Sequence, residues 1–491
     1  MTVDPSPSVT PIVTYVDYKA GERRANSLNP AERLGLLAIG FFISVNAVGL
    51  AVHAASVVLV VYTPLAILIA LLLFFVQPSL YVGFAWWILF LSPFVRRLVD
   101  YQLGFRSNNP ILLAPLVVTG LSLLSVSYHA PKLLRRTLYP FLLVLVALAY
   151  GFVVGIAHVG ILAAGYGLTT WLAPVTFGIY LALHPEWYSD MRRMLARVFI
   201  SSLLILGVYG VWQFVSPPPW DVYWITASLQ SNALNPEPFK VRLFGTLNSF
   251  GPFAAVLTAG LLVTFAWPSQ VWKRCLAAVP GAASLMMTQV RTAWGELALG
   301  LGLYLLYLPG RRRLAPIAIL LLSFVILVLS NIQPFASVLV SRAGSIASLT
   351  TDGSYLARRQ LFAEYNDRIL ESPLGMGTGA TGMAWVLTGG NGSTAPIENG
   401  FQDVFYSLGW MGGTLYLCAV LILARRSLKR EERNTDLFAK VARAITIATL
   451  LAAWFGNIFT AVAGTVLWTF LGMQVASRLR RFGTDNWHSL T

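Results

Sequence analysis

The chain has 491 residues, of which 56% are hydrophobic and 11% are charged, and its mean hydropathy is +0.68. A soluble domain carries about 25% charged residues, so the composition excludes a soluble globular protein and indicates a polytopic membrane protein. The net charge of +15 would favour nucleic-acid binding in a soluble protein. Here an excess of lysine and arginine on the cytoplasmic side of a membrane explains it better, and we expect no nucleic-acid partner.

The first predicted element is a polar N-terminal tail over residues 1–34, with several prolines and a mixed-charge stretch at 17–33. A secretory signal peptide would instead place a short apolar core near the start. We therefore expect a cytoplasmic tail, and a second cytoplasmic tail over residues 478–491. Residues 35–477 between the tails are expected to form a single transmembrane domain.

Apolar stretches long enough to cross a bilayer follow one another through this domain. A span needs about 20 mostly apolar residues, and about fourteen stretches qualify, although two close-set pairs reduce the count if they merge. The predicted fold class is therefore an all-α polytopic membrane protein with about 12–14 transmembrane helices. The predicted spans lie near residues 35–54, 56–76, 79–95, 109–126, 139–157, 160–183, 195–216, 249–267, 274–290, 292–309, 314–332, 402–424, 441–459 and 462–477.

The distribution of lysine and arginine sets the predicted orientation. With the N-terminus inside, most of the 35 basic residues fall in the tails and in alternate connections on one side of the membrane. This bias places both termini in the cytoplasm and requires an even number of spans. Two long connections, about 217–248 and 332–401, then lie outside the cytoplasm, and the second is expected to contain short helices.

Arginines in the outer connections oppose this bias and need another explanation. Arg291 lies in a tight turn between two spans, where it either extends to the interface or has a function, as charges at the membrane often do. Arg358 and Arg359 begin an amphipathic helix. Guanidinium groups bind phosphate bidentately, whereas the structural alternative is an ion pair with Asp352 or Glu364. We expect at least one of the two arginines to be functional.

Three further features lie at the ends of the outer connections. Glu398 precedes the span that starts near residue 402, and its carboxylate is either a general base for a hydroxyl or a charge that complements the helix N-terminus. Arg242 leads into the span at 249, downstream of aromatic residues that either stack on sugars or form an interfacial belt. The glycine-rich turn at 375–382 lacks the phosphate-loop ending, and we expect it to be structural, with backbone angles that favour glycine.

The remaining polar residues give weaker signals. The five histidines are scattered and the two cysteines lie far apart, so neither set has the spacing of a metal or redox site. Arg96, Arg97 and Arg106 form a third outer basic group near Asp100. Contact with a lipid phosphate and an ion pair explain that group equally well.

Four pieces of sequence stand in order within residues 242–417. They are 242–248 (RLFGTLN), 287–294 (MTQVRTAW), Arg358 followed by 373–377 (PLGMG), and 398–401 (ENGF) followed by 408–412 (LGWMG). In order and spacing these pieces resemble the O-antigen ligase and O-antigen polymerase superfamily of bacterial membrane glycosyltransferases. The resemblance implies a bundle similar to the C-type glycosyltransferases, with a large periplasmic loop near its C-terminal end.

The resemblance also implies a reaction and its site. Members act on oligosaccharides linked to undecaprenyl pyrophosphate at the periplasmic face of the inner membrane, without a metal or other cofactor. Arg291 and Arg358 match the two essential arginines of the family, which would bind the pyrophosphate and stabilise its growing charge. We expect Arg242 and Arg359 to assist them.

The fourth piece departs from the ligase pattern. Ligases usually have a histidine before the asparagine, whereas this chain has Glu398 before Asn399. Glutamate still deprotonates or positions a hydroxyl, so Glu398 is the expected catalytic carboxylate. Asn248 and Asn399 are expected to bind the substrate. The departure favours a polymerase over a ligase.

We therefore expect an inverting enzyme that polymerises lipid-linked repeat units into a surface polysaccharide or exopolysaccharide. The alternatives are a ligase that transfers glycan to another acceptor, a flippase for lipid-linked oligosaccharides, and a scaffold of an export complex. A flippase should show two related halves, and no internal repeat is visible. Besides membrane lipid, a chain-length regulator or export complex is an expected partner by analogy.

Overall fold

The fold is known from a computed structural model. The structure describes residues 29–228, 235–267, 271–306, 353–382, 384, 397–428 and 436–482. In these ranges all regular elements are helices. The predicted all-α class is therefore confirmed for this part of the chain.

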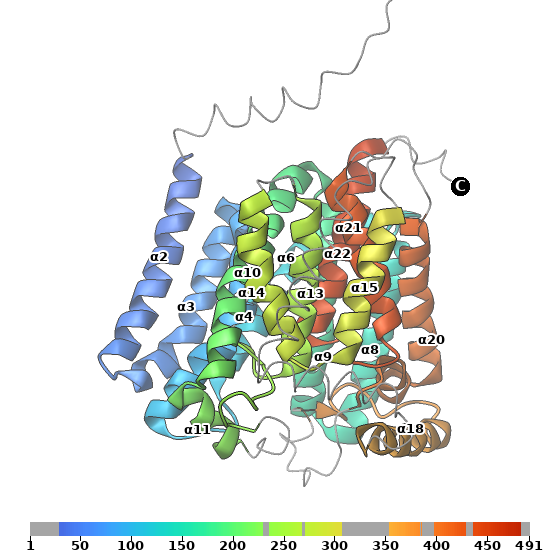
Figure 1. The fold of residues 1–491 in the computed structure, drawn as a ribbon. Helices are drawn as coiled ribbons and strands as arrows, with labels where there is room; N and C mark the ends of the chain where they lie inside the picture. The colour runs from blue at the N-terminus through green and yellow to red at the C-terminus, as the bar shows by residue number, and fades with distance from the viewer. Residues whose placement is uncertain are drawn as a thin grey trace, which may run out of the picture.

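Most helices run along the height of one bundle, whereas α11 (Pro219–Ala227) and α18 (Gly353–Glu371) lie at one end of it (Figure 1). The long helices are α2 (Pro30–Ala51), α3 (Ala55–Val76), α4 (Pro78–Leu103), α8 (Tyr139–Val159), α9 (Ile161–Leu183), α10 (Tyr188–Val215), α13 (Phe250–Ala266), α14 (Val271–Met287), α15 (Arg291–Leu306), α20 (Gly400–Leu428), α21 (Leu437–Ala452) and α22 (Ala461–Phe482). The shorter elements are η1 (Pro110–Leu112), α5 (Leu113–Gly120), α6 (Ser122–Tyr128), α7 (Ala130–Leu133), η2 (Pro185–Trp187), α11 (Pro219–Ala227) and α18 (Gly353–Glu371).

These helices confirm a polytopic α-helical membrane protein. Every predicted span inside the described ranges overlaps a helix, or the successive short helices over Pro110–Tyr128. The span predicted at 441–459 runs too far, because α21 ends at Ala452. Eight helical stretches of the described part are long and apolar enough to cross a membrane, and α13 is shorter but apolar. The span predicted at 314–332 lies outside the described residues, so the total number of spans stays a prediction.

The two ends of the bundle differ in chemistry. We call the end where α2 begins and α22 ends the upper end, and the end with α11 and α18 the lower end (Figure 1). At the upper end Arg426 donates to the backbone oxygen of Arg136 over 2.9 Å, and Arg480 donates to Ser189 Oγ over 2.6 Å. Basic residues that were predicted to face the cytoplasm therefore share one end, opposite α18.

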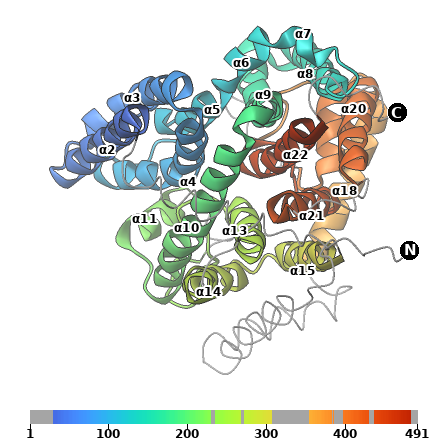
Figure 2. The ribbon, with the colours of Figure 1, turned by 90° about the horizontal axis from the view of Figure 1, so that it is seen from above.

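The helices α9 and α22 pack against each other through glycine (Figure 2). A Cβ on Gly472 would lie 2.2 Å from the carbonyl oxygen of Gly178, and a Cβ on Gly178 would lie 2.5 Å from that of Trp468. Neither position therefore accepts a side chain. Small residues let membrane helices approach closely, and the gain comes from van der Waals packing because lipid is as apolar as the side chains.

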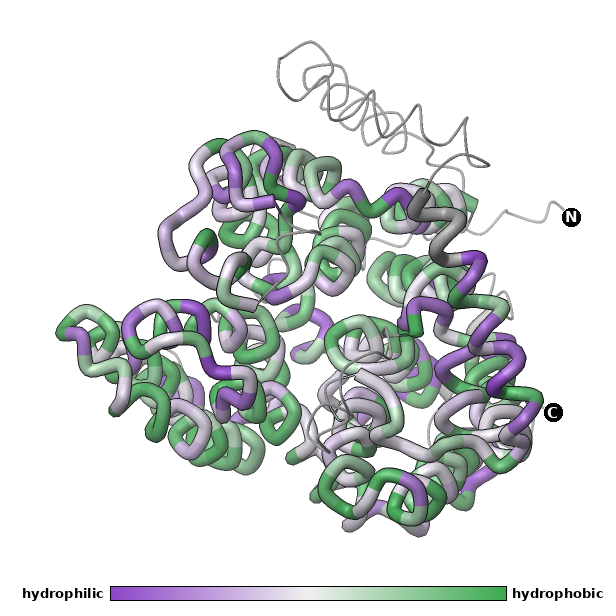
Figure 3. Tube along the Cα trace, turned by 90° about the horizontal axis from the view of Figure 1, so that it is seen from below, coloured by the Kyte–Doolittle hydropathy of each residue, from purple (hydrophilic) through white to green (hydrophobic). Residues whose placement is uncertain are grey.

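Three hydrophobic clusters organise the interior. One joins α3, α4, α10, α13, α14 and α15, and a second joins α8, α9, α20 and α22. A third, small cluster holds α18 against the start of α20 through Tyr365, Ile369, Ile397 and Tyr406. Hydrophobic residues also predominate along the helices seen from the lower end (Figure 3), as expected where helices face hydrocarbon.

Candidate functional site

A cavity of about 670 Å³ lies at the lower end of the bundle. It is enclosed by the starts of α15 and α20, by α18 and by the end of α21. Its lining includes four of the predicted site residues, namely Arg291, Arg359, Glu398 and Asn399. Ligand pockets are typically about 300–1,000 Å³, mostly apolar, with a few converging polar groups. The large apolar side chains of this lining are Leu299, Leu361, Phe362, Leu451, Trp454 and Phe455.

The turn between α14 and α15 places Arg291 in the cavity. The Thr288 hydroxyl donates to the Leu285 carbonyl over 2.7 Å, and Trp294 Nε1 donates to the same oxygen over 3.3 Å. Gln289 has a φ of 58°, so this tight turn contains a left-handed residue. Arg291 is the first residue of α15. A cation there opposes the helix macrodipole, whereas an anion would be attracted by both the guanidinium and the helix N-terminus.

Arg242 lies outside the cavity lining and supports this turn. Its Nε donates to the carbonyl oxygen of Thr288 over 3.0 Å, and its guanidinium lies 3.5 Å from the centroid of the Phe250 ring. The backbone of Leu243 also donates to Met287 over 3.3 Å. The structure therefore places Arg242 as a brace for the turn that carries Arg291.

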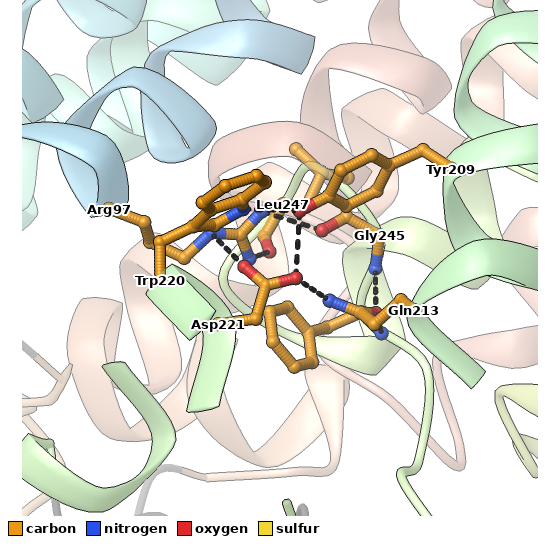
Figure 4. A network of polar contacts seen from close by, with 8 residues as sticks. Arg97, Tyr209, Gln213, Trp220, Asp221, Gly245 and Leu247 are labelled. Atoms are coloured by element: carbon orange, nitrogen blue, oxygen red, sulfur yellow. Dashed lines mark hydrogen bonds and ion pairs between the residues drawn. The ribbon is translucent and has the colours of Figure 1, made fainter. Parts of the chain in front are cut away.

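A buried polar network in turn holds the segment that contains Arg242 (Figure 4). The ion pair between Arg97 and Asp221 spans 3.2 Å, and both side chains are fully buried. Arg97 donates to the carbonyl oxygens of Leu247 and Gly245 over 2.8 and 2.6 Å. Gln213 joins both parts, since it accepts from the Gly245 amide and donates to Asp221. The network fixes the backbone just after Arg242.

Arg96, a second member of the outer basic group, is also engaged within the protein. Arg96 pairs with Asp100 over 3.0 Å and donates to the backbone of Arg106 over 2.7 Å. For Arg96 and Arg97 the ion-pair explanation is therefore confirmed. Asn248 follows the segment held by the network and lies outside the cavity lining. Its Oδ1 is buried without a hydrogen-bond partner among the described residues.

Asn399 forms structural hydrogen bonds at the start of α20. Its Oδ1 accepts from the amides of Phe401 and Gln402 over 2.9 and 3.1 Å, and its Nδ2 donates to the Trp454 carbonyl over 3.0 Å. Asn399 thus satisfies amides at the helix start and ties α20 to the end of α21. Glu398, directly before it, is exposed in the cavity wall. Its charge complements the helix N-terminus and is also accessible to a ligand.

The helix α18 forms the outer wall of the cavity. Gln402 Nε2 donates to the Phe362 carbonyl over 2.7 Å and links α18 to α20. Arg359 is exposed and lines the cavity. Arg358 lies in the same helix, but its side chain is outside the described part. Glu364 forms an ion pair with Arg368 over 2.6 Å.

The wall of α18 also contributes a tyrosine to the cavity. Burial raises the pKa of Tyr365 above its ordinary value. The phenol is therefore neutral at physiological pH and can donate a hydrogen bond to a ligand.

The glycine-rich turn after α18 is structural, as predicted. Gly377 has a φ of 86°, and a Cβ there would lie 2.1 Å from the backbone of Gly155. The amide of Thr378 donates to the Gly151 carbonyl over 2.9 Å, and the amide of Met376 donates to Tyr406 over 2.8 Å. These amides are used inside the protein and do not form a phosphate cradle.

Glu296 is a lining residue that the sequence analysis missed. It lies on α15, and its Oε1 accepts from the Thr449 hydroxyl over 2.6 Å. A carboxylate inside a predicted span is itself a signal of function. It falls within the span predicted at 292–309 and not in an outer connection, so the charge pattern of the sequence does not single it out.

A larger cavity of about 1010 Å³ lies between α2, α4 and α10 and contains none of the predicted site residues. Its walls are mainly apolar and lie on helices with exposed hydrophobic side chains. Hydrocarbon of the bilayer suits such a surface. Its charged lining residues, Glu32, Asp190, Arg193 and Arg197, lie in segments predicted to be cytoplasmic. We place the candidate site in the smaller cavity, because the predicted site residues Arg291, Arg359 and Glu398 line it.

No protein-family model and no curated protein matches the chain. Among the described residues, no group of three or more histidine, cysteine, aspartate or glutamate side chains is placed to hold a metal ion.

Proposed function

We propose that the chain is an inverting glycosyltransferase that polymerises polyprenyl-pyrophosphate-linked oligosaccharide repeat units at the outer face of a bacterial inner membrane. The convergence of Arg291, Arg359 and Glu398 in one cavity at the lower end carries the proposal. The upper end, with its basic residues, would face the cytoplasm. A lipid-linked donor fits this arrangement, because the cavity joins charged groups to apolar walls at the end of a membrane bundle.

The two arginines of the cavity would bind the pyrophosphate of the donor. Guanidinium binds phosphate bidentately and stays charged at any physiological pH. The N-terminus of α15 adds a partial positive charge beside Arg291. Arg358 precedes the lining residues Leu361 and Phe362 by three and four positions. This is the spacing of neighbours on one side of an α-helix. We therefore include it in the donor site.

The reaction would be a single displacement. A hydroxyl of the acceptor sugar attacks the anomeric carbon of the donor, and the bond from that carbon to the pyrophosphate oxygen breaks. The pyrophosphate leaves with the electron pair, and the arginines stabilise its charge. Glu398 would position or deprotonate the acceptor hydroxyl. Inversion at the anomeric carbon follows from attack opposite the leaving group.

The same cavity would also suit the alternative activity, a ligase that transfers glycan to a different acceptor. The two activities differ in the acceptor alone, and Glu398 in place of the ligase histidine favours the polymerase. A flippase needs a substrate path through the centre of the bundle, and both described cavities lie at its edge or end. A chain-length regulator or export complex would complete the system in the cell.

The test is a transfer assay with purified protein in lipid vesicles and a polyprenyl-pyrophosphate repeat unit. We expect wild type to produce a ladder of lengthened glycans. Arg291→Ala should slow transfer about 100-fold or more, as the loss of one transition-state donor does. Arg193→Ala is the matched control, because Arg193 pairs with Asp190 at the upper end, and its rate should equal that of wild type.

Three outcomes would contradict the proposal. Folded wild type that transfers glycan to no acceptor is not a glycosyltransferase. Transfer of single units to another acceptor, without a ladder, would replace the polymerase with a ligase. Normal transfer by Arg291→Ala would move the donor site elsewhere.

A further inference from the structure

One face of α15 lines the cavity over two turns. The lining positions are Thr292, Gly295, Glu296 and Leu299. Their separations of three and four residues are those of neighbours on one side of an α-helix. Glu296 therefore stands in the cavity wall beyond Arg291, on a regular helix rather than in a loop.

A second helix holds the Glu296 carboxylate in place. Thr449 lies on α21, is 3% exposed, and donates to Oε1 over 2.6 Å. This bond satisfies one lone pair, whereas a carboxylate has two oxygens and about four acceptor sites. Thr449 is the one hydrogen-bond donor to this carboxylate among the residues that the structure describes. A carboxylate among apolar side chains is costly when a single neutral donor compensates it. A purely structural link between helices would need no charge, since hydroxyl and amide side chains serve that role.

Gly295 leaves space beside this carboxylate. A Cβ added at Gly295 would meet no protein atom within 4 Å, whereas one at Gly300, on the same helix, would lie 2.6 Å from Leu262. Helix packing thus explains Gly300 and does not explain Gly295. The missing side chain widens the cavity next to Glu296.

We propose that Glu296 is the residue that binds and deprotonates the acceptor hydroxyl, with the acceptor sugar in the space beside Gly295. This inference rests on the proposed function. The acceptor O–H bond breaks, its proton moves to the carboxylate, and the oxygen bonds to the anomeric carbon as the pyrophosphate departs. Glu398, exposed in the cavity wall, then positions the incoming glycan.

The spacing along α15 suits this division of tasks. Arg291 and Glu296 are five residues apart, which is about 7.5 Å along a helix axis. An inverting displacement needs the sugar to lie between the base and the leaving group, because nucleophile and leaving group occupy opposite faces of the sugar. The donor sugar would lie between the pyrophosphate at Arg291 and the acceptor at Glu296.

Glu296→Gln tests the assignment, because glutamine keeps the shape and an oxygen that accepts from Thr449. We expect transfer to slow about 100-fold or more, the usual contribution of general base catalysis, with binding of undecaprenyl pyrophosphate in nanodiscs unchanged. Arg291→Ala should instead lose binding of undecaprenyl pyrophosphate. Glu186→Gln, at the upper end beside His184, is the control and should transfer at the wild-type rate.

Gly295→Leu tests the proposed acceptor site independently if Glu296→Gln does not fold. The new side chain enters open space, so the variant should fold, bind undecaprenyl pyrophosphate, and show at least a tenfold higher KM for the acceptor. Normal transfer by Glu296→Gln, loss of donor binding in that variant, or an unchanged acceptor KM in Gly295→Leu would each overturn the inference. Inactive wild type would instead overturn the proposed function.

Discussion

Arg97 and Asp221 lie outside the cavity, yet their ion pair supports it through the backbone. Arg97 donates to the carbonyls of Gly245 and Leu247, and Arg242 in the same segment donates to the turn before Arg291. The sequence could not distinguish this role from a lipid contact, because Asp221 is distant in the chain. An arginine that opposes the positive-inside bias is thus a sign of either function or burial.

Loss of one partner of this buried pair should be costly. We expect Arg97→Met to lower the free energy of unfolding by about 3–5 kcal/mol, because Asp221 would remain charged and buried. The measurement is reversible unfolding in mixed micelles. Addition of Asp221→Asn should recover part of the loss, and a double variant less stable than Arg97→Met would contradict the account.

The presence and order of the helices could be predicted well, because a bilayer demands long apolar stretches, although α21 ends seven residues before the predicted end of its span. The contacts made by polar residues at element ends could not. Asn399 was predicted to bind substrate, and it caps α20. Glu296 was missed inside a span, because its cavity is formed by four separate segments. Sequence patterns along one helix do not reveal which helices meet across a cavity.

Two glycines of the turn after α18 allow a test of close backbone packing between elements. Gly377→Ala places a Cβ 2.1 Å from the backbone of Gly155 at positive φ, whereas Gly382→Ala has positive φ but open space. We expect a loss of about 3 kcal/mol for the first, as in overpacked sites. The second should cost about 1 kcal/mol from backbone strain alone. Equal unfolding free energies would show that the close approach is unimportant.

At the scale of the whole molecule, charge divides the bundle into two functional ends. The upper end carries basic residues that contact neighbouring segments, and the lower end carries the cavity beneath α18. The orientation predicted from lysine and arginine puts this cavity outside the cytoplasm. A lipid-linked donor would reach it sideways from the outer leaflet, with its polyprenyl chain in the bilayer and its pyrophosphate at Arg291.

Photo-crosslinking tests the proposed donor site most directly. The protein in lipid vesicles is labelled with a photoactivatable undecaprenyl pyrophosphate, and the labelled peptides are mapped. We expect saturable labelling of the cavity walls, on peptides from α15, α18 and the start of α20, with labelling lost in Arg291→Ala. Labelling confined to the apolar cavity between α2, α4 and α10, or unaffected by Arg291→Ala, would contradict the proposed donor site.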